Sequence, residues 1–184
     1  MPILGTIASS RLVAAPANPS FDALYSWNNN NGSGQTIDFT SIDQTYRHLQ
    51  VRLQVQQNAG QGILIRFNGD TGNNYGNYWI NASTGSKGAP DSWINPFPQS
   101  VPDPSQNNEY AFAIVDIHDY SQTDKIKTVF IRQSQVRSSG GRGNSYSGHF
   151  WASTSAITSL QLVQNNPSFN FTQYSQATIY GIKG

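Results

Sequence analysis

The stretch from Tyr46 to Phe67 limits what this chain can fold into more than any other feature of the sequence. Four aliphatic residues alternate with polar ones from Leu49 to Val55, which puts the two kinds of side chain on opposite faces of an extended strand. Asn58–Gly62 follows with two glycines that allow the positive φ angles of a turn, and the next five residues are mostly apolar again. The pattern predicts a long antiparallel hairpin. The polar set expected in water is His48, Gln50, Arg52, Gln54 and Gln56.

Similar short patterns, separated by Asn, Gly, Ser and Asp, occur along the rest of the chain. The further strands that they predict are Phe21–Trp27, Gln35–Thr40, Tyr110–Ile117, Lys127–Arg132, His149–Ala152, Ile157–Val163 and Ala177–Ile182. Charged residues make up only 11% of the 184 residues, so the surface lacks the strong helix formers of a helical protein. We therefore expect an all-β protein, a single antiparallel β-sandwich of jelly-roll type over residues 21–184.

Charge and cysteine content exclude several classes of function. The formal net charge is +1 and the basic residues form no run, so neither nucleic acid nor a membrane surface is an expected partner. The chain has no cysteine, which excludes disulfides, thiolate metal sites and cysteine nucleophiles. No apolar run approaches the roughly 18 residues of a membrane-spanning helix.

Residues 1–20 have no periodicity and end in the sequence Pro16-Ala17-Asn18-Pro19. Chain ends of this kind are ordered when they are held by the domain or by a neighbour. We expect this N-terminal arm to attach the protein to a partner. The apolar residues that would make that contact are Pro2, Ile3, Leu4 and Ile7.

A run of roughly 40 residues from Asn68 to Pro104 has little regular pattern and predicts a long loop. It contains the richest group of aromatic residues outside the expected strands, namely Tyr75, Tyr78, Trp79, Trp93 and Phe97. Three interpretations are open. The rings anchor the loop to the sandwich, they form an interface with another protein, or they stack on the sugars of a glycan whose hydroxyls bond to nearby Asn and Gln.

The tripeptide Asp70-Thr71-Gly72 matches the one found in aspartic proteases. That chemistry needs two carboxylates that share a proton, and no second copy of the tripeptide occurs. Asn, Gly and Asp satisfy turn backbones, so we interpret Asn68–Asn74 as a turn. A calcium site built from Asp70, Asn73 and Asn74 remains an alternative, although the set holds one carboxylate and lacks the bidentate Glu of calcium loops.

The remaining catalytic and cofactor signatures are absent from the sequence. The three histidines, His48, His118 and His149, form no close-spaced ligand pair, so no zinc is expected. There is no Gly-x-Ser-x-Gly nucleophile turn, and the glycine-rich run at Gly140–Gly143 lacks the Lys-Ser/Thr of a phosphate-binding loop. The sequence predicts a protein without enzymatic activity, cofactor or metal.

Several stretches, in order along nearly the whole chain, resemble a group of small virion structural proteins of bacteriophages, in particular those of cyanophages and other aquatic phages. The matching stretches are MPILGTIASS at the start, Tyr46–Arg52, Arg66–Tyr75, Ile117–Tyr120, Lys125–Val129, Ala156–Leu160 and Ala177–Gly184. The resemblance implies a non-enzymatic β-sandwich built into a virion. It brings no catalytic residues, and the segment from about Ala82 to Asn108 has no counterpart in it.

Two hypotheses about function follow. In the first, the protein is a tail or fibre appendage or a capsid-decorating protein, located in the virion and docked on other tail or capsid proteins through its N-terminal arm. It would be a homo-oligomer, with a trimer favoured. In the second, it is a carbohydrate-binding module that uses the loop aromatics, with a host glycan as the ligand; one protein can satisfy both hypotheses.

Overall fold

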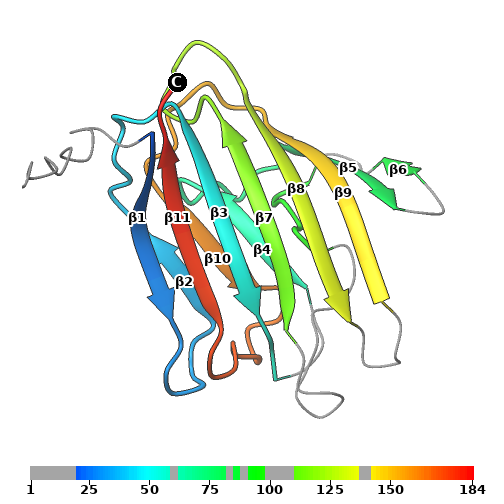
Figure 1. The fold of residues 1–184 in the computed structure, drawn as a ribbon. Coiled ribbons are helices and arrows are strands. Elements are labelled where there is room, and N and C mark those ends of the chain that lie inside the picture. Colours follow the sequence, from blue (N-terminus) through cyan, green and yellow to red (C-terminus); the bar gives the residue numbers. More distant parts are fainter. Residues whose placement is uncertain (1–19, 59–61, 82–84, 88–90, 98–109, 137–141) are drawn as a thin grey trace, which may run out of the picture.

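The computed structural model describes residues 20–184 except 59–61, 82–84, 88–90, 98–109 and 137–141 (Figure 1). Eleven strands lie in these described residues. They are β1 (Phe21–Asn28), β2 (Thr36–Phe39), β3 (His48–Val55), β4 (Ile63–Phe67), β5 (Tyr75–Asn81), β6 (Gly85–Lys87), β7 (Ala111–His118), β8 (Lys127–Val136), β9 (Arg142–Trp151), β10 (Leu160–Gln164) and β11 (Gln176–Ile182). The N-terminal arm, including Pro2, Ile3, Leu4 and Ile7, lies outside the described residues.

The strands form two antiparallel sheets, one in front of the other (Figure 1). The larger sheet has eight strands in the order β1-β11-β3-β7-β8-β9-β5-β6, and the smaller has three in the order β2-β10-β4. Every strand pairing between described residues is antiparallel. The expectation of an all-β, antiparallel protein is confirmed. No helix in the described part of the chain has the length and apolar character needed to cross a membrane.

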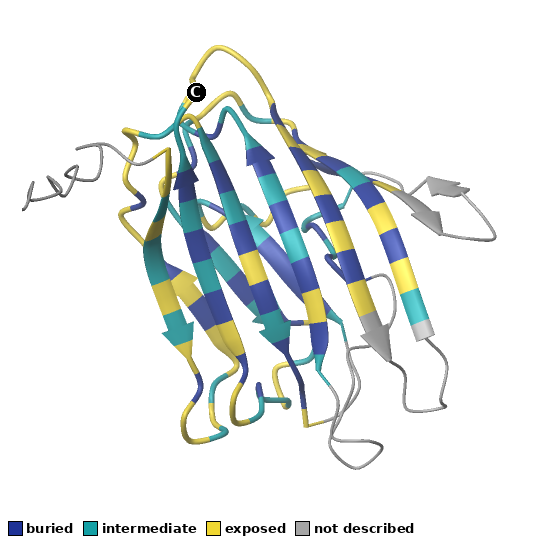
Figure 2. Ribbon diagram, in the orientation of Figure 1, coloured by how far each residue is buried: buried dark blue, intermediate teal, exposed yellow. Residues whose placement is uncertain are grey.

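The core lies between the two sheets, and the alternation in the sequence produces it. The aliphatic residues of β3 from Leu49 to Val55 are all buried, as the sequence predicted. In β7 and β8 the residues that face the same way, such as Val115 and Val129, are buried too. Figure 2 shows the result as bands of buried and more exposed residues that alternate along β3, β7, β8 and β9. Since successive side chains point to opposite faces, one face of the large sheet covers the core and the other faces outward.

The predicted hairpin between the two halves of the Tyr46–Phe67 stretch is wrong. Strand β3 pairs with β11 on one side and with β7 on the other, whereas β4 pairs with β10 in the smaller sheet. The chain crosses from one sheet to the other between them. Strand β4 suits this position because its apolar residues are buried on both faces, including Leu64.

The crossing also explains why Gln56, expected in water, is buried. Its side-chain oxygen accepts a hydrogen bond of 2.7 Å from the Thr172 hydroxyl, and the next residue, Gln57, forms a bridge with Phe171. The Gln57 amide also bonds to Gln164 at the end of β10. These contacts hold the chain against the segment before β11. The polar residues Gln56 and Gln57, which follow β3, are therefore buried and hydrogen-bonded.

The prediction of a 40-residue loop from Asn68 to Pro104 is wrong for the first half of that segment. Residues Tyr75–Asn81 form β5, which pairs with β9 along its whole length, and β6 pairs with β5. Further on, Asp91 bridges to Tyr75, and Ile94 bridges to Ile65 of β4. The aromatic residues of β5 favour a strand, but the Asn and Gly residues between them hide its periodicity in the sequence.

The large sheet is much wider than the small one, and the smaller sheet lies behind its β1 side (Figure 1). The inward-facing residues of the wider part include a buried polar set on β5, β8 and β9. Its members are Asn77, Gln133, Ser145, Ser147 and His149. Here the segment around Asp91 and Trp93 lies against the sheet, because the Asn77 amide reaches both at 3.4 Å.

Candidate functional site

The structure separates the five aromatic residues that the sequence groups together. Tyr75 and Phe97 are 1% and 0% exposed and lie in the core, so no ligand reaches them and they are removed as glycan or interface residues. For these two, the interpretation as anchors of the loop describes the structure. Tyr78 is 48% exposed on β5, and Trp93 is half-buried. Trp79 belongs to β5 and pairs with Ser147, but its side chain lies outside the described part.

Asp70 lies in a turn whose hydrogen bonds occupy both oxygens of its carboxylate. The Gly72 N–H donates to Oδ1 at 2.8 Å, the Asn74 amide donates to Oδ2 at 2.9 Å, and Trp151 Nε1 donates to Oδ2 at 2.7 Å. Burial opposes ionisation of this carboxyl, but the three donors outweigh it and hold the pKa of Asp70 below its ordinary value. The tripeptide therefore has the bonding of a structural turn that holds Trp151 against the core.

We expect Asp70→Asn to lower the free energy of unfolding at pH 7 by about 1 kcal/mol, because charge-assisted hydrogen bonds become neutral ones. A carboxyl whose folded pKa is depressed contributes stability above its unfolded pKa and loses it as the pH falls through the folded value. The difference between variant and wild type should therefore shrink in acid. Urea unfolding at pH 7 and at pH 3 measures it, and a difference that stays constant would contradict the assignment.

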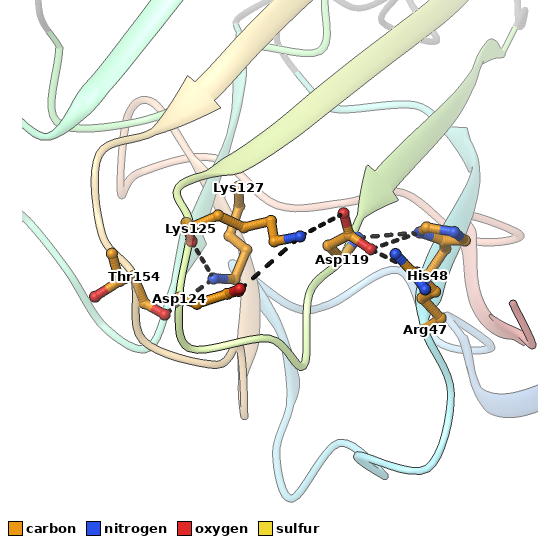
Figure 3. A network of polar contacts seen from close by, with 7 residues as sticks. All are labelled: Arg47, His48, Asp119, Asp124, Lys125, Lys127 and Thr154. Atoms are coloured by element: carbon orange, nitrogen blue, oxygen red, sulfur yellow. Dashed lines mark hydrogen bonds and ion pairs between the residues drawn. The ribbon is translucent and has the colours of Figure 1, made fainter.

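A second polar cluster joins the loops at the same end of the sheets (Figure 3). The Arg47 guanidinium bonds to Asp119 Oδ1 at 2.8 Å, and Lys125 lies 3.7 Å from the other oxygen. The hydrogen bond from Arg47 is the main reason that the pKa of Asp119 is lowered. His48 Nδ1 accepts the Asp119 backbone N–H at 3.0 Å, so the ring is neutral here and makes no ion pair with the carboxylate.

Lys127 belongs to this cluster but is fully buried. Its ammonium donates to the carbonyl oxygens of Lys125 and Thr154 at 2.8 and 3.1 Å (Figure 3). Burial lowers the pKa of Lys127. No group of three or more His, Cys, Asp or Glu among the described residues is placed to hold a metal.

Another buried histidine lies under the wide part of the large sheet. His149 Nδ1 is 2.6 Å from Asn77 Oδ1, and Nε2 is 2.8 Å from the Ser147 hydroxyl. The Asn77 nitrogen bonds to Asp91 and to the Trp93 carbonyl, which turns the amide oxygen toward the ring. The ring is therefore neutral with its proton on Nδ1, and burial lowers the pKa of His149 to about 4.

The outward face of the large sheet carries the least covered aromatic residues on its strands. Phe112 on β7 is 52% exposed. Four others lie together on the neighbouring strands, with Phe130 57% exposed, Tyr146 64%, Tyr78 48% and Phe150 43%. Phe130 on β8 pairs with Gly148 on β9, and Gly148 pairs with Tyr78 on β5. Tyr146 and Phe150 come two residues before and after Gly148 on the same strand. The four rings therefore surround one glycine, and we call this set the aromatic face.

A hollow of about 530 Å³ lies over this glycine and has a mainly apolar lining. Tyr78, Phe130 and Tyr146 line it together with Gly148, and Asp116, His118 and Arg132 line its β7–β8 side. A second, smaller hollow of about 290 Å³ shares Arg132 and Tyr146 with it and extends toward Phe112. The outward face thus offers a continuous open surface of rings with a few polar groups.

Only Tyr78 of the aromatic face belongs to the site predicted from the sequence. Phe130 lies in the predicted strand Lys127–Arg132, where it stands between the buried residues Val129 and Ile131. An aromatic residue in the polar phase of an amphipathic strand is the signal that identifies it. The residues on both sides of Phe130 are apolar as well, so the alternation cannot be recognised in the sequence. The segment resembles a strand that is buried on both faces.

Comparisons with protein-family models, with curated proteins and with solved structures gave no match to this chain.

Proposed function

We propose that this protein is a non-enzymatic structural component of a bacteriophage virion. It would be a tail or fibre appendage or a capsid-decorating protein that docks on neighbouring virion proteins through residues 1–15 and acts as a homo-oligomer, a trimer in the favoured form. Its fold would be a jelly roll with additional strands at one edge of the larger sheet.

The strand order supports the jelly-roll assignment. From β1 to β4 the chain alternates between the two sheets at each step. Strand β11 returns between β1 and β3, and β10 returns between β2 and β4, which is the return connection of Greek-key folds. Ile94 pairs beside β4 at the position of a fourth strand in the smaller sheet. Jelly rolls occur in viral capsid proteins and in lectins, which agrees with both hypotheses from the sequence.

The observation that carries the virion proposal is that the stretches behind the resemblance meet in space. Asn68 donates to the Ala156 carbonyl at 2.8 Å and accepts the Thr158 N–H at 2.8 Å. The Ile157 N–H donates to the Tyr120 carbonyl at 2.8 Å. Stretches that are far apart in the sequence therefore form one bonded end of the molecule, which supports a shared fold over separate chance matches.

We expect the protein to be found in purified particles of the phage that encodes it, and deletion of residues 1–15 to lower its incorporation at least tenfold. The arm supplies the attachment in this proposal, whereas the described strands begin at Phe21, so the deletion removes no residue of the described strands. Quantitative mass spectrometry of density-purified particles measures the amount.

The matched control is Tyr174→Ala, which changes a 63% exposed side chain far along the chain from the arm and should leave incorporation unchanged. Circular dichroism verifies that the deletion variant is folded. Unchanged incorporation of the deletion variant would contradict attachment by the arm, and absence of the wild-type protein from the particles would contradict the virion assignment itself.

The second candidate function is carbohydrate recognition. The exposed aromatic face favours it, because large rings open to solvent on a rigid sheet are a costly arrangement unless they contact a ligand or partner. Of the glycan site predicted from the sequence, this hypothesis keeps Tyr78. The other residues that it now proposes lie on the outward face of the large sheet and not in the loop.

A further inference from the structure

The geometry points to the hollow over Gly148 as a binding site for a neutral saccharide chain that crosses the strands between Phe130 and Tyr78. This inference rests on carbohydrate recognition, the second candidate function, and gives it a location and a class of ligand. It is independent of where in the virion the protein is attached.

The arrangement of the rings sets the size of the occupant. Phe130 and Tyr78 are separated by one intervening strand, so their backbones stand about 10 Å apart, twice the spacing of neighbouring strands. That distance is close to the length of two linked pyranose rings. Two alternate sugars of one chain therefore reach Phe130 and Tyr78 with their apolar faces, where ring stacking is favourable.

Gly148 supplies the floor between the two rings. A strand glycine marks a place where a ligand can approach the backbone closely, because no side chain stands in the way. Tyr146 stands about 7 Å away along β9 and lines the hollow on that side, and Phe150 stands at the same distance in the other direction. Phe150 is held in place by resting over Gly76, where even a Cβ atom would lie 2.0 Å from its ring.

The polar groups at the hollow favour a neutral ligand. The Arg132 guanidinium bonds to Asp116 Oδ2 at 2.9 Å, so their charges cancel, and Gln50 occupies the other oxygen of Asp116 at 2.7 Å. The Tyr78 and Tyr146 hydroxyls make no hydrogen bond to any described residue. Both remain available to the hydroxyls of a sugar, which act as donors and acceptors at once.

The same groups argue against an apolar protein surface as the occupant. Covering this face with apolar side chains would remove water from two phenol hydroxyls and from an ion pair without replacing their hydrogen bonds, and that is costly. A saccharide supplies hydroxyls to these groups and hydrogen-bearing carbon faces to the rings. The mixture of groups at the hollow therefore matches a sugar.

The test begins with a glycan array probed with the purified full chain, followed by isothermal titration calorimetry with cellohexaose, xylohexaose, mannohexaose and, as the acidic comparison, an alginate hexamer. We expect binding to at least one neutral chain and weaker or no binding to alginate. Phe130→Ala and Tyr78→Ala should each lower the affinity about tenfold, as expected for one stacked ring.

Gly148→Ala is the decisive variant. Its Cβ would lie 3.7 Å from the Phe130 ring, an ordinary contact, so the fold is kept while the floor of the hollow is raised. We expect loss of binding with an unchanged unfolding midpoint. Tyr174→Ala, which removes a comparably exposed ring away from the aromatic face, is the matched control and should bind like the wild type.

Three results would overturn the inference. They are no binding by the wild type on the array, equal loss in Tyr174→Ala, and full binding by Gly148→Ala. Sedimentation velocity adds a fourth, because dissociation of an oligomer by Phe130→Ala or Tyr78→Ala would assign the face to a second copy of the chain. Incorporation into particles is measured separately, so either proposal can fail while the other stands.

Discussion

Replacing Asn68 with alanine is expected to lower the free energy of unfolding by about 2–3 kcal/mol. The Asn68 backbone has φ 51°, in the left-handed region that alanine adopts at a cost of roughly 1 kcal/mol. Its side chain also bonds to the Ala156 carbonyl and to the N–H groups of Thr158 and Ser159, at 2.8, 2.8 and 3.1 Å. One side chain thus closes the loop before β10 onto the turn after β4, and urea denaturation measures its effect.

Two further variants separate the contributions. Asn68→Gly removes the same hydrogen bonds without the backbone strain, so it should be about 1 kcal/mol more stable than Asn68→Ala. Asn68→Asp keeps the acceptor for Thr158 and Ser159 and should lie between alanine and the wild type. If alanine and aspartate gave equal losses, the hydrogen bonds would not be the source of the stability.

Lowering the pH from 6.5 to 4 is expected to cost about 3 kcal/mol of stability through His149 alone. Burial holds the folded pKa of this ring at about 4, whereas the unfolded chain binds the proton near pH 6.5. The unfolded state therefore gains protons over this window and the folded state does not, so stability is complete above pH 6.5 and falls with the pH. The carboxyl groups of Asp70 and Asp119 act at lower pH, because their folded pKa values lie below 3.8.

His149→Gln is expected to remove most of this slope, because an amide bonds to Asn77 and Ser147 without titrating. The measurement is the free energy of unfolding by urea at half-unit steps between pH 7 and pH 4. His48→Gln is the matched control. Burial also lowers the pKa of His48, but its ring is partly exposed at the surface, so its contribution to the slope should be smaller. Equal slopes for the wild type and His149→Gln would contradict the burial argument.

The strands were largely predictable from the sequence, because a strand that is buried on one face has apolar residues at every second position. Leu49–Val55 shows this most clearly, and the segments that form β1, β2, β7, β8 and β11 were placed within a few residues. The same pattern gave the correct inward face of β3. Local periodicity was sufficient for these elements because it depends only on which side of a strand is buried.

The pairing of the strands was not predictable in the same way. The seven-residue connection between β3 and β4 is compatible with a hairpin and with a crossing to the opposite sheet, and the choice depends on the distant strands β10 and β11. Strand β5 was missed because Gly76 and Asn77 lower its strand propensity. That glycine is required by the ring of Phe150 above it, a contact that no local pattern contains.

The candidate site was only partly predictable, since exposure decides which aromatic residues can bind. Tyr75 and Tyr78 are three residues apart on one strand and point to opposite faces, so one is in the core and the other on the aromatic face. Phe130, Tyr146 and Phe150 come from strands that the sequence presented as scaffold. Their meeting around Gly148 follows from the register of β5, β8 and β9, which is a property of the whole sheet.

That register has a consequence for how the protein can change. Along β9 the odd-numbered residues Ser147, His149 and Trp151 face inward, and the even-numbered Tyr146, Gly148 and Phe150 face outward. Substitution at the outward positions alters the aromatic face while the core stays intact. Insertion or deletion of a single residue within β9 would exchange the inward and outward sets beyond that point. His149 would then face solvent, or the Tyr146 phenol would face the interior. The chemistry of the aromatic face can therefore change through point substitutions, whereas a change in the length of β9 would disrupt the core.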